Sequence, residues 1–205
     1  MSLTNGSEGI MKSTFELPCG YRQCLHVDLA KNKKLFLLVN LAAALIGVAL
    51  AIAGIVICPI SATFDAEEYI WMPLLRFGVL MIAFPVYIVL HELVHGLFIR
   101  IFSGKGAHYK FTLAYASAGS DAYFGKWSYI VIALSPVVLL GALLAVLCAL
   151  LPATWFWVAY AIQILNLSGA AGDYYVTLRF CTLPRDILVR DSGTAMTVYT
   201  PEGEA

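Results

Sequence analysis

A chain of 205 residues that is 60% hydrophobic and only 13% charged is too apolar for a soluble domain, in which about 45–50% of residues are apolar. Its formal net charge of zero, from 13 basic and 13 acidic residues, argues against nucleic acid or any other strongly charged partner. The composition therefore predicts a protein that folds in the lipid bilayer.

The N-terminal segment, residues 1–34, is polar and mixed, and no small-residue cleavage site follows the first apolar run, so a cleaved signal peptide is not expected. Alternation of apolar and polar residues in Tyr21–Leu29 favours a short strand. Cys19, Cys24 and His26 could bind a metal ion, but no second pair of ligands follows them. We therefore interpret this region as an ordinary cytoplasmic segment.

Four apolar stretches follow, each long enough to cross the roughly 30 Å hydrocarbon core of a bilayer as a helix. They lie at about Leu35–Ile57, Leu74–Phe102, Tyr129–Leu151 and Trp155–Leu178. Pro59 and Pro152 fit helix ends, because proline disfavours helical geometry in the preceding residue. The sequence thus predicts an all-α membrane protein in which residues 35–178 form one domain of four transmembrane helices.

The connecting segments predict the orientation of these helices. Lysine and arginine gather before the first span, between the second and third, and after the fourth, at Lys31, Lys33, Lys34, Arg100, Lys105, Lys110, Lys126, Arg179, Arg185 and Arg190. The first connection instead carries Asp65, Glu67 and Glu68. By the positive-inside rule both termini are expected to be cytoplasmic, with residues 179–205 forming a cytoplasmic tail whose last part is loosely ordered. Disulfides between the five cysteines are not expected in that compartment or in lipid.

The connection between the second and third spans predicts a small cytoplasmic β-hairpin. Tyr109–Tyr115 and Ala122–Phe124 favour strands, and the small residues of Ala116–Asp121 favour the turn between them. This hairpin, Tyr109–Phe124, could hold an extended peptide by adding it as a further strand, or it could serve only as a cytoplasmic cover.

The second span contains the sequence His91-Glu92-Leu93-Val94-His95, which places three ionisable groups in an apolar helix. Residues four apart project from one face of a helix, so both imidazoles can bind the same zinc ion. Glu92 follows the first histidine and can act as general base toward the water that the metal activates. Histidines satisfied by ordinary hydrogen bonds are the alternative, but ionisable groups are costly in a membrane helix, so the pattern favours the metal site.

A zinc ion that activates water needs a third protein ligand. Asp173 is the leading candidate, because it is the only acidic residue in the four spans besides Glu92, and His26 and His108 lie in polar segments. Counted from the basic residues at the cytoplasmic ends of their helices, Asp173 and His95 lie at a similar depth, roughly 8–9 Å at 1.5 Å per residue. A carboxylate that reaches the membrane surface is the alternative interpretation.

Asn166 precedes Asp173 by about two helical turns, and a run of small residues that permits close helix approach lies between them. Its amide could donate a hydrogen bond to the oxyanion of a reacting peptide, or to a neighbouring helix. The sequence leaves both roles open.

From about Phe15 to Leu178 the chain resembles the bacterial putative zincin peptidase family. The resemblance is carried by the histidine motif in a membrane span, the following hairpin, Ser135-Pro136, the small-residue run ending in Gly172-Asp173, and the N-terminal stretches Glu16–Tyr21 and Lys31–Leu35. More distantly, the chain is similar to site-2 proteases, which pair this motif with an aspartate on a later span. Those proteases have an Asn-x-x-Pro…Asp-Gly motif, whereas here the proline is absent and Tyr174 follows Asp173.

Residues and resemblance together predict an intramembrane zinc metalloprotease of the bacterial cell membrane that cleaves membrane-embedded or membrane-proximal peptides near the cytoplasmic face. His91, His95 and Asp173 would hold Zn²⁺, and Glu92 and Asn166 would act on the reacting groups. A metal transporter is one alternative, but the first and third spans contain no ionisable group that could form a path. A non-catalytic zinc-binding membrane protein is another, and the presence of Glu92 argues against it.

Overall fold

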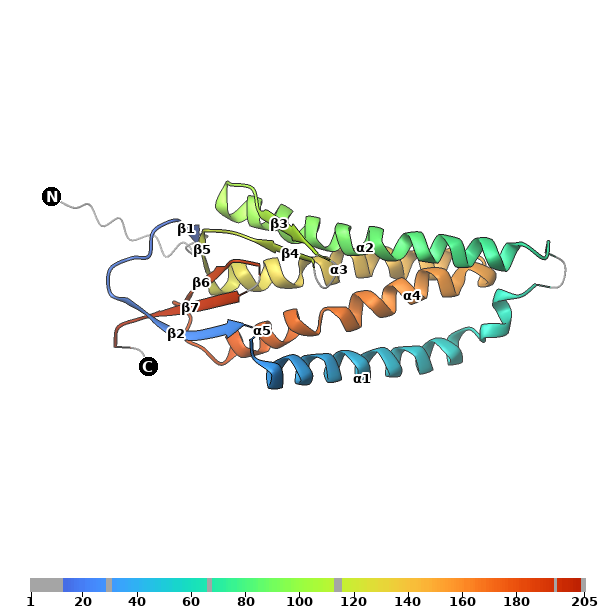
Figure 1. Ribbon diagram of the computed structural model, residues 1–205, viewed down its shortest axis with the longest axis horizontal. Helices are drawn as coiled ribbons and strands as arrows, with labels where there is room; N and C mark the ends of the chain where they lie inside the picture. Colours follow the sequence, from blue (N-terminus) through green and yellow to red (C-terminus); the bar gives the residue numbers. More distant parts are fainter. Residues whose placement is uncertain (1–12, 29–30, 66–67, 113–115, 194, 204–205) are drawn as a thin grey trace.

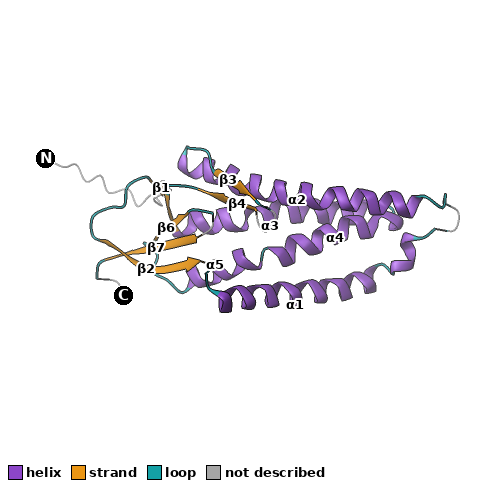
Figure 2. Cartoon of the chain, viewed as in Figure 1, coloured by secondary structure: helices purple, strands orange, loops and turns teal. Residues whose placement is uncertain are grey.

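The computed structural model describes residues 13–28, 31–65, 68–112, 116–193 and 195–203, and it is mostly helical, with strands gathered at one end (Figures 1 and 2). The helices in these ranges are α1 (Lys33–Ile57), α2 (Met72–Ser103), α3 (Lys126–Leu150), α4 (Ala153–Gly169) and α5 (Ala171–Cys181), with the short 3-10 helix η1 (Ile60–Thr63). In Figure 1 the long helices run side by side, and α4 and α5 follow one path between α1 and α2.

The helices α1, α2 and α3 are long and apolar enough to cross a membrane. Large apolar side chains on them face outward, such as Leu37, Val56, Ile82 and Val138, with exposed fractions of 69%, 82%, 68% and 62%. Exposed apolar surface of this extent is unfavourable in water but natural in lipid. The first three predicted spans are therefore confirmed as helices fit for a membrane, with ends that differ by a few residues from those predicted.

The fourth predicted span, Trp155–Leu178, is not one continuous helix. It divides into α4 and α5 at Ala170, where ψ changes to 14°. The break falls within Gly169-Ala170-Ala171-Gly172, in which glycine is a weak helix former. Separately, α4 and α5 are too short to count among the candidate spans.

A five-stranded antiparallel sheet joins parts of the chain that are far apart in sequence. Its strands are β1 (Ser13–Thr14), β2 (Tyr21–Asp28), β5 (Tyr123–Gly125), β6 (Leu188–Asp191) and β7 (Ala195–Pro201), in the spatial order β1-β5-β6-β7-β2. The strand β2 before α1 thus pairs with β7 near the C-terminus, from Tyr21 opposite Pro201 to Asp28 opposite Ala195. The predicted strand at Tyr21–Leu29 is confirmed as far as Asp28, and Leu29 lies outside the described residues.

The expectation of an all-α fold with one small hairpin understates the strands, and the loosely ordered end predicted for the tail is wrong. Residues 195–201 form β7 because Met196 and Val198 turn alternately into the core. The hairpin exists, but its strands are β3 (His108–Phe111) and β4 (Ala116–Gly119), so part of the predicted turn is a strand. Residues 113–115 of the predicted first strand lie outside the described residues.

The small residues of β4 serve close packing. A Cβ atom at Gly119 would lie 2.4 Å from the backbone carbon of Ser192, in the turn between β6 and β7. The backbone N–H of Ser120 also donates to the carbonyl of Asp191 over 2.7 Å. Small side chains at this point therefore bring the hairpin against the large sheet.

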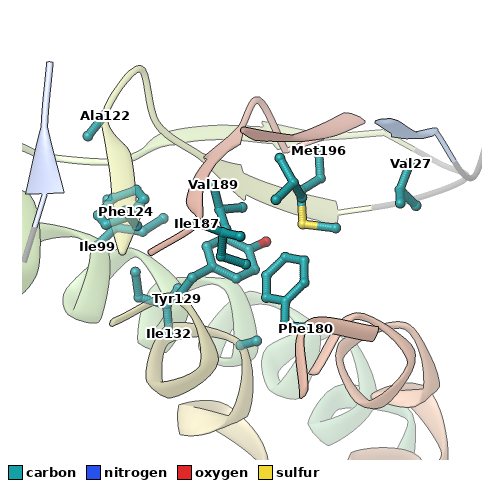
Figure 3. Close-up of a cluster of buried hydrophobic side chains, with 12 residues drawn as sticks. Val27, Ile99, Ala122, Phe124, Tyr129, Ile132, Phe180, Ile187, Val189 and Met196 are labelled. Atoms are coloured by element: carbon teal, nitrogen blue, oxygen red, sulfur yellow. The ribbon is translucent and has the colours of Figure 1, made fainter. Parts of the chain in front are cut away.

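The main core lies between this sheet and the adjoining ends of the helices. Phe124 and Val189 from the sheet and Phe180 from α5 are fully buried and surround Tyr129 of α3 (Figure 3). Aromatic packing of this kind contributes beyond the area it buries. It fixes the start of α3 and the end of α5 against the sheet, and so holds the frame in which the polar residues of α2 and α5 meet.

Candidate metal centre

The structure brings together the three side chains predicted as metal ligands. His91 and His95 project from successive turns of α2, and Asp173 projects from the first turn of α5. The Oδ2 atom of Asp173 lies 3.7 Å from Nε2 of His91 and 3.9 Å from Nε2 of His95. All three ligand atoms lie within 4.8 Å of one another. Ligands at 2.0–2.2 Å from a tetrahedral ion are about 3.3–3.6 Å apart, so small side-chain rotations would suffice to share one ion.

A cavity of about 290 Å³ opens beside these ligands, between the helices and the strands. Its wall includes Glu92 from α2, Ala118 from β4 and Gly193 from the turn between β6 and β7. Glu92 is only 9% exposed, and the backbone amide of Ala118 lies near its carboxyl group. The carboxyl group of Glu92 is thus held beside the candidate ligands, at the edge of the cavity.

Comparison with protein families identifies the chain. A family model described as "Putative zincin peptidase" matches residues 84–188, about half of the sequence. The chain belongs to the putative zincin peptidase family. The matched part contains His91, Glu92, His95 and Asp173 and runs from within α2 to the start of β6. Comparisons with curated proteins and with solved structures give no match, so the more distant similarity to site-2 proteases stays a prediction.

The donor set of this putative zincin peptidase fits zinc. Two imidazole nitrogens and one carboxylate oxygen form the type of three-ligand set that catalytic zinc sites use. The Nδ1 atom of His95 lies 2.9 Å from the backbone carbonyl of Ile132, which can only accept, so Nδ1 carries the hydrogen. The lone pair of Nε2 on His95 is then free on the side facing Asp173.

The other sequence candidates for metal ligands lie elsewhere. Nδ1 of His26 lies 3.0 Å from the hydroxyl of Thr197, and His108 pairs with Asp121 at 3.3 Å. Cys19 and Cys24 are exposed. Within the described parts of the chain, only His91, His95 and Asp173 form a group of three or more side chains that could hold a metal.

Asn166 hydrogen-bonds to neighbouring helices, which is one of the two roles that the sequence left open. It is fully buried, and its Nδ2 group donates to the carbonyl of Val137 on α3 over 3.2 Å. Its Oδ1 atom accepts a hydrogen bond of 3.0 Å from the hydroxyl of Tyr87. Asn166 does not line the cavity described above, and its oxyanion role stays a prediction.

Sequence reasoning missed two groups near the site, the carboxyl of Asp191 and the phenol of Tyr129. Asp191 is half-buried and lines the cavity, with Oδ1 accepting from the N–H of Gly193 over 2.7 Å and the other oxygen accepting from Tyr129. Burial raises the pKa of the Asp191 carboxyl above its usual value. The sequence Asp191-Ser192-Gly193 is typical of a turn, but only the sheet shows that this turn reaches the site.

Proposed function

We propose that this protein is a zinc metallopeptidase that hydrolyses peptide bonds of membrane-embedded or membrane-proximal segments near the cytoplasmic face. The single observation that carries the proposal is the meeting of His91, His95 and Asp173 beside the Glu92 carboxylate, in a cavity at the boundary between apolar helices and a polar sheet. Membership of the family supports the peptidase chemistry.

Each of these residues has a distinct task in this proposal. His91, His95 and Asp173 would hold the zinc ion, the two histidines through Nε2 and the aspartate through a carboxylate oxygen. When bound there, zinc acts as a Lewis acid and lowers the pKa of water to about 7. Glu92 accepts the proton of the water that attacks the peptide carbonyl, and it returns this proton to the leaving amine.

The strand β4 supports binding of the substrate as an extended chain. It pairs with β3 along one edge, while Ala116, Ser117 and Ala118 line the cavity. Peptide hydrolysis needs an unwound substrate, and a strand edge can hold one through main-chain hydrogen bonds. The small side chains of β4 leave room for the backbone of such a peptide close to Glu92.

The pairing of the strands supports a fourth crossing of the membrane by α4 and α5 together. The strands β2, β5 and β7 lie in one sheet and therefore on one side of the membrane. Between β2 and β5 the chain crosses twice, through α1 and α2. From β5 it crosses once through α3, so α4 and α5 must bring it back to reach β6 and β7. The 17 residues of α4 span about 26 Å at 1.5 Å per residue, and α5 extends this path.

The proposal is tested with Glu92→Gln in purified protein. The amide keeps the size of the side chain but cannot accept the proton, so cleavage of a membrane peptide is expected to vanish while one zinc ion per chain is retained. Glu202→Gln, an exposed change at the far end of β7, is the matched control and should leave both quantities unchanged. Cleavage by the Glu92 variant would overturn the mechanism, and loss of zinc would make Glu92 a ligand.

A further inference from the structure

A chain of hydrogen bonds leads from the candidate metal site into the centre of the helix bundle. The hydroxyl of Tyr87 lies 2.9 Å from Nδ1 of His91 and 3.0 Å from Oδ1 of Asn166. The Nδ2 group of Asn166 in turn lies 3.2 Å from the carbonyl of Val137. Tyr87 is 8% exposed and Asn166 is fully buried. The chain therefore joins α2, α4 and α3 in surroundings without competing water.

The direction of each bond in this chain follows from its chemical groups. The carbonyl of Val137 can only accept, so the amide nitrogen of Asn166 must face it, and Oδ1 must face Tyr87. That oxygen also can only accept, so the single hydroxyl hydrogen of Tyr87 is donated to Asn166. The phenol oxygen then has lone pairs alone to offer to His91. Nδ1 of His91 must accordingly carry a hydrogen and donate it to Tyr87.

We propose that Tyr87 and Asn166 are positioning residues that hold His91 as the Nδ1–H tautomer, with the lone pair of Nε2 directed at the metal. This inference rests on the zinc site of the proposed function, and it does not depend on proteolysis. Both histidines would then donate from Nδ1 and direct the lone pair of Nε2 at the metal. His91 donates to the hydroxyl of Tyr87, whereas His95 donates to the backbone carbonyl of Ile132. Only the His91 arrangement depends on side chains that mutation can remove.

The surroundings determine the size of the expected effect. Within the bundle, water does not replace a lost partner as it would at a surface, so His91 without Tyr87 would be free to rotate or to change tautomer. Loss of the hydrogen-bond partner of a metal-binding histidine typically weakens metal affinity about 10–100-fold. The inference thus assigns Asn166 an effect on metal affinity, whereas an oxyanion donor would affect turnover alone.

The first test is Tyr87→Phe, which removes one oxygen atom and leaves the ring in place. Competition between purified protein and a zinc chelator is expected to show affinity lowered about 10–100-fold. The matched control is Tyr160→Phe, because Tyr160 is also 8% exposed and its hydroxyl donates to the helix carbonyl of Leu50 over 2.8 Å, away from the metal site. This control should bind zinc as the wild type does, while both variants unfold at similar temperatures without metal.

A double-mutant cycle with Asn166→Ala tests the chain as a unit. If Tyr87 acts on His91 in concert with Asn166, the double variant should lose about as much zinc affinity as the more affected single variant. If the fold losses of zinc affinity in the two single variants multiply in the double variant, Tyr87 and Asn166 act independently, and the proposed chain of hydrogen bonds is wrong. Normal zinc affinity in Asn166→Ala together with lost cleavage would make Asn166 an oxyanion donor and would also overturn it.

The inference and the proposed function fail in different ways. Zinc affinity of Tyr87→Phe within about twofold of the wild type would overturn the inference alone, because the hydrogen-bond partners of ligands usually contribute more than this. A wild-type protein that binds no zinc would overturn both. If Asn166→Ala does not fold, the comparison of Tyr87→Phe with Tyr160→Phe still decides, since each replaces one buried phenol by a ring of the same shape.

Discussion

Asp173 belongs to the candidate metal site because a helix starts next to it. The break at Ala170 places this carboxylate in the first turn of α5, where the positive end of the helix dipole favours a negative charge. The same turn faces His91 and His95 of α2 at 3.7 Å and 3.9 Å. Backbone geometry and charge thus act together to hold this carboxylate opposite the two histidines.

Replacement of Asp173 should therefore affect zinc binding before it affects the fold. Asp173→Ala removes one of three ligands, so it is expected to weaken zinc affinity more than the roughly 10–100-fold typical of changes around a ligand, and to abolish cleavage. Asp173→Asn keeps one weaker oxygen donor and should retain feeble binding. Zinc analysis of purified variants measures this, with the exposed Asp186→Asn as control. Full zinc content in Asp173→Ala would remove Asp173 from the ligand set.

Among the site residues, the histidine motif and Asp173 could be predicted from the sequence, because helical spacing and the cost of charge in a membrane single them out. Tyr87 could also have been predicted as a neighbour of His91, since it lies four residues before it on the same helix face. The partner of Asn166 was not, because a contact between α4 and α2 depends on how the helices pack. Asp191 was missed for the same reason.

Among the elements, the turn between β6 and β7 depends on one glycine. Gly193 has a φ of +84°, and a Cβ atom there would lie 3.0 Å from Oγ of Ser117 on β4. Gly193→Ala is expected to lower the free energy of unfolding by about 1–2 kcal/mol, the typical cost of the left-handed region for a residue with a side chain. Gly106→Ala is a suitable control, because no atom lies within 4 Å of its added Cβ and its φ is not positive. Equal stability of both variants in thermal unfolding would contradict this account.

Asp191, at the end of β6 beside the same turn, is expected to make stability depend on pH. Burial raises the pKa of Asp191 in the folded protein above the usual 3.8, so the folded state binds this proton more tightly than the unfolded state. The stability that this carboxyl contributes is then fully present below pH 3.8 and is lost as pH rises through the folded pKa. Asp191→Asn cannot lose a proton, and its unfolding temperature should vary less between about pH 4 and about pH 7 than that of the wild type.

The change of the unfolding temperature with pH distinguishes the titration of Asp191 from an effect of the substitution on packing. Asp186→Asn serves as the control, because Asp186 is an exposed carboxylate between α5 and β6, five residues before Asp191. A wild-type slope in the Asp191 variant would assign the dependence to other groups. A uniform shift at every pH would show that the change alters packing around Tyr129 alone.

Strands of this sheet were only partly predictable, for a physical reason. The strand β2 has eight residues and a weak alternation of apolar and polar side chains, whereas β5 and β6 have three and four residues and carry little pattern of their own. They are strands because distant segments pair with them, with Phe124 opposite Val189 and Val189 opposite Val198. Pairing between segments that are far apart in sequence determines such short strands more than local preference does.

For the whole molecule, the sheet and the helices together predict the path through the membrane. Most basic residues lie at the sheet end, around Lys105 and Arg185, while Ser61, Ala153 and the buried Arg76 lie at the opposite end of the helices. From the positive-inside rule we expect the sheet, both termini and the metal site to lie on the cytoplasmic side. The pairing of β2 with β7 demands an even number of crossings between them.

Single cysteines in a variant without the native ones would test this path with a thiol reagent that does not cross membranes. Ser61→Cys and Ala153→Cys should react in intact cells, whereas Lys105→Cys and Arg185→Cys should react only after the cells are opened. All four positions are exposed, so the surrounding membrane side rather than burial decides their reaction. Arg185 is the decisive position, because a chain with three crossings would leave it outside. Reaction of Arg185→Cys in intact cells, with Lys105→Cys still protected, would contradict the fourth crossing, and a complete reversal of the pattern would instead invert the orientation.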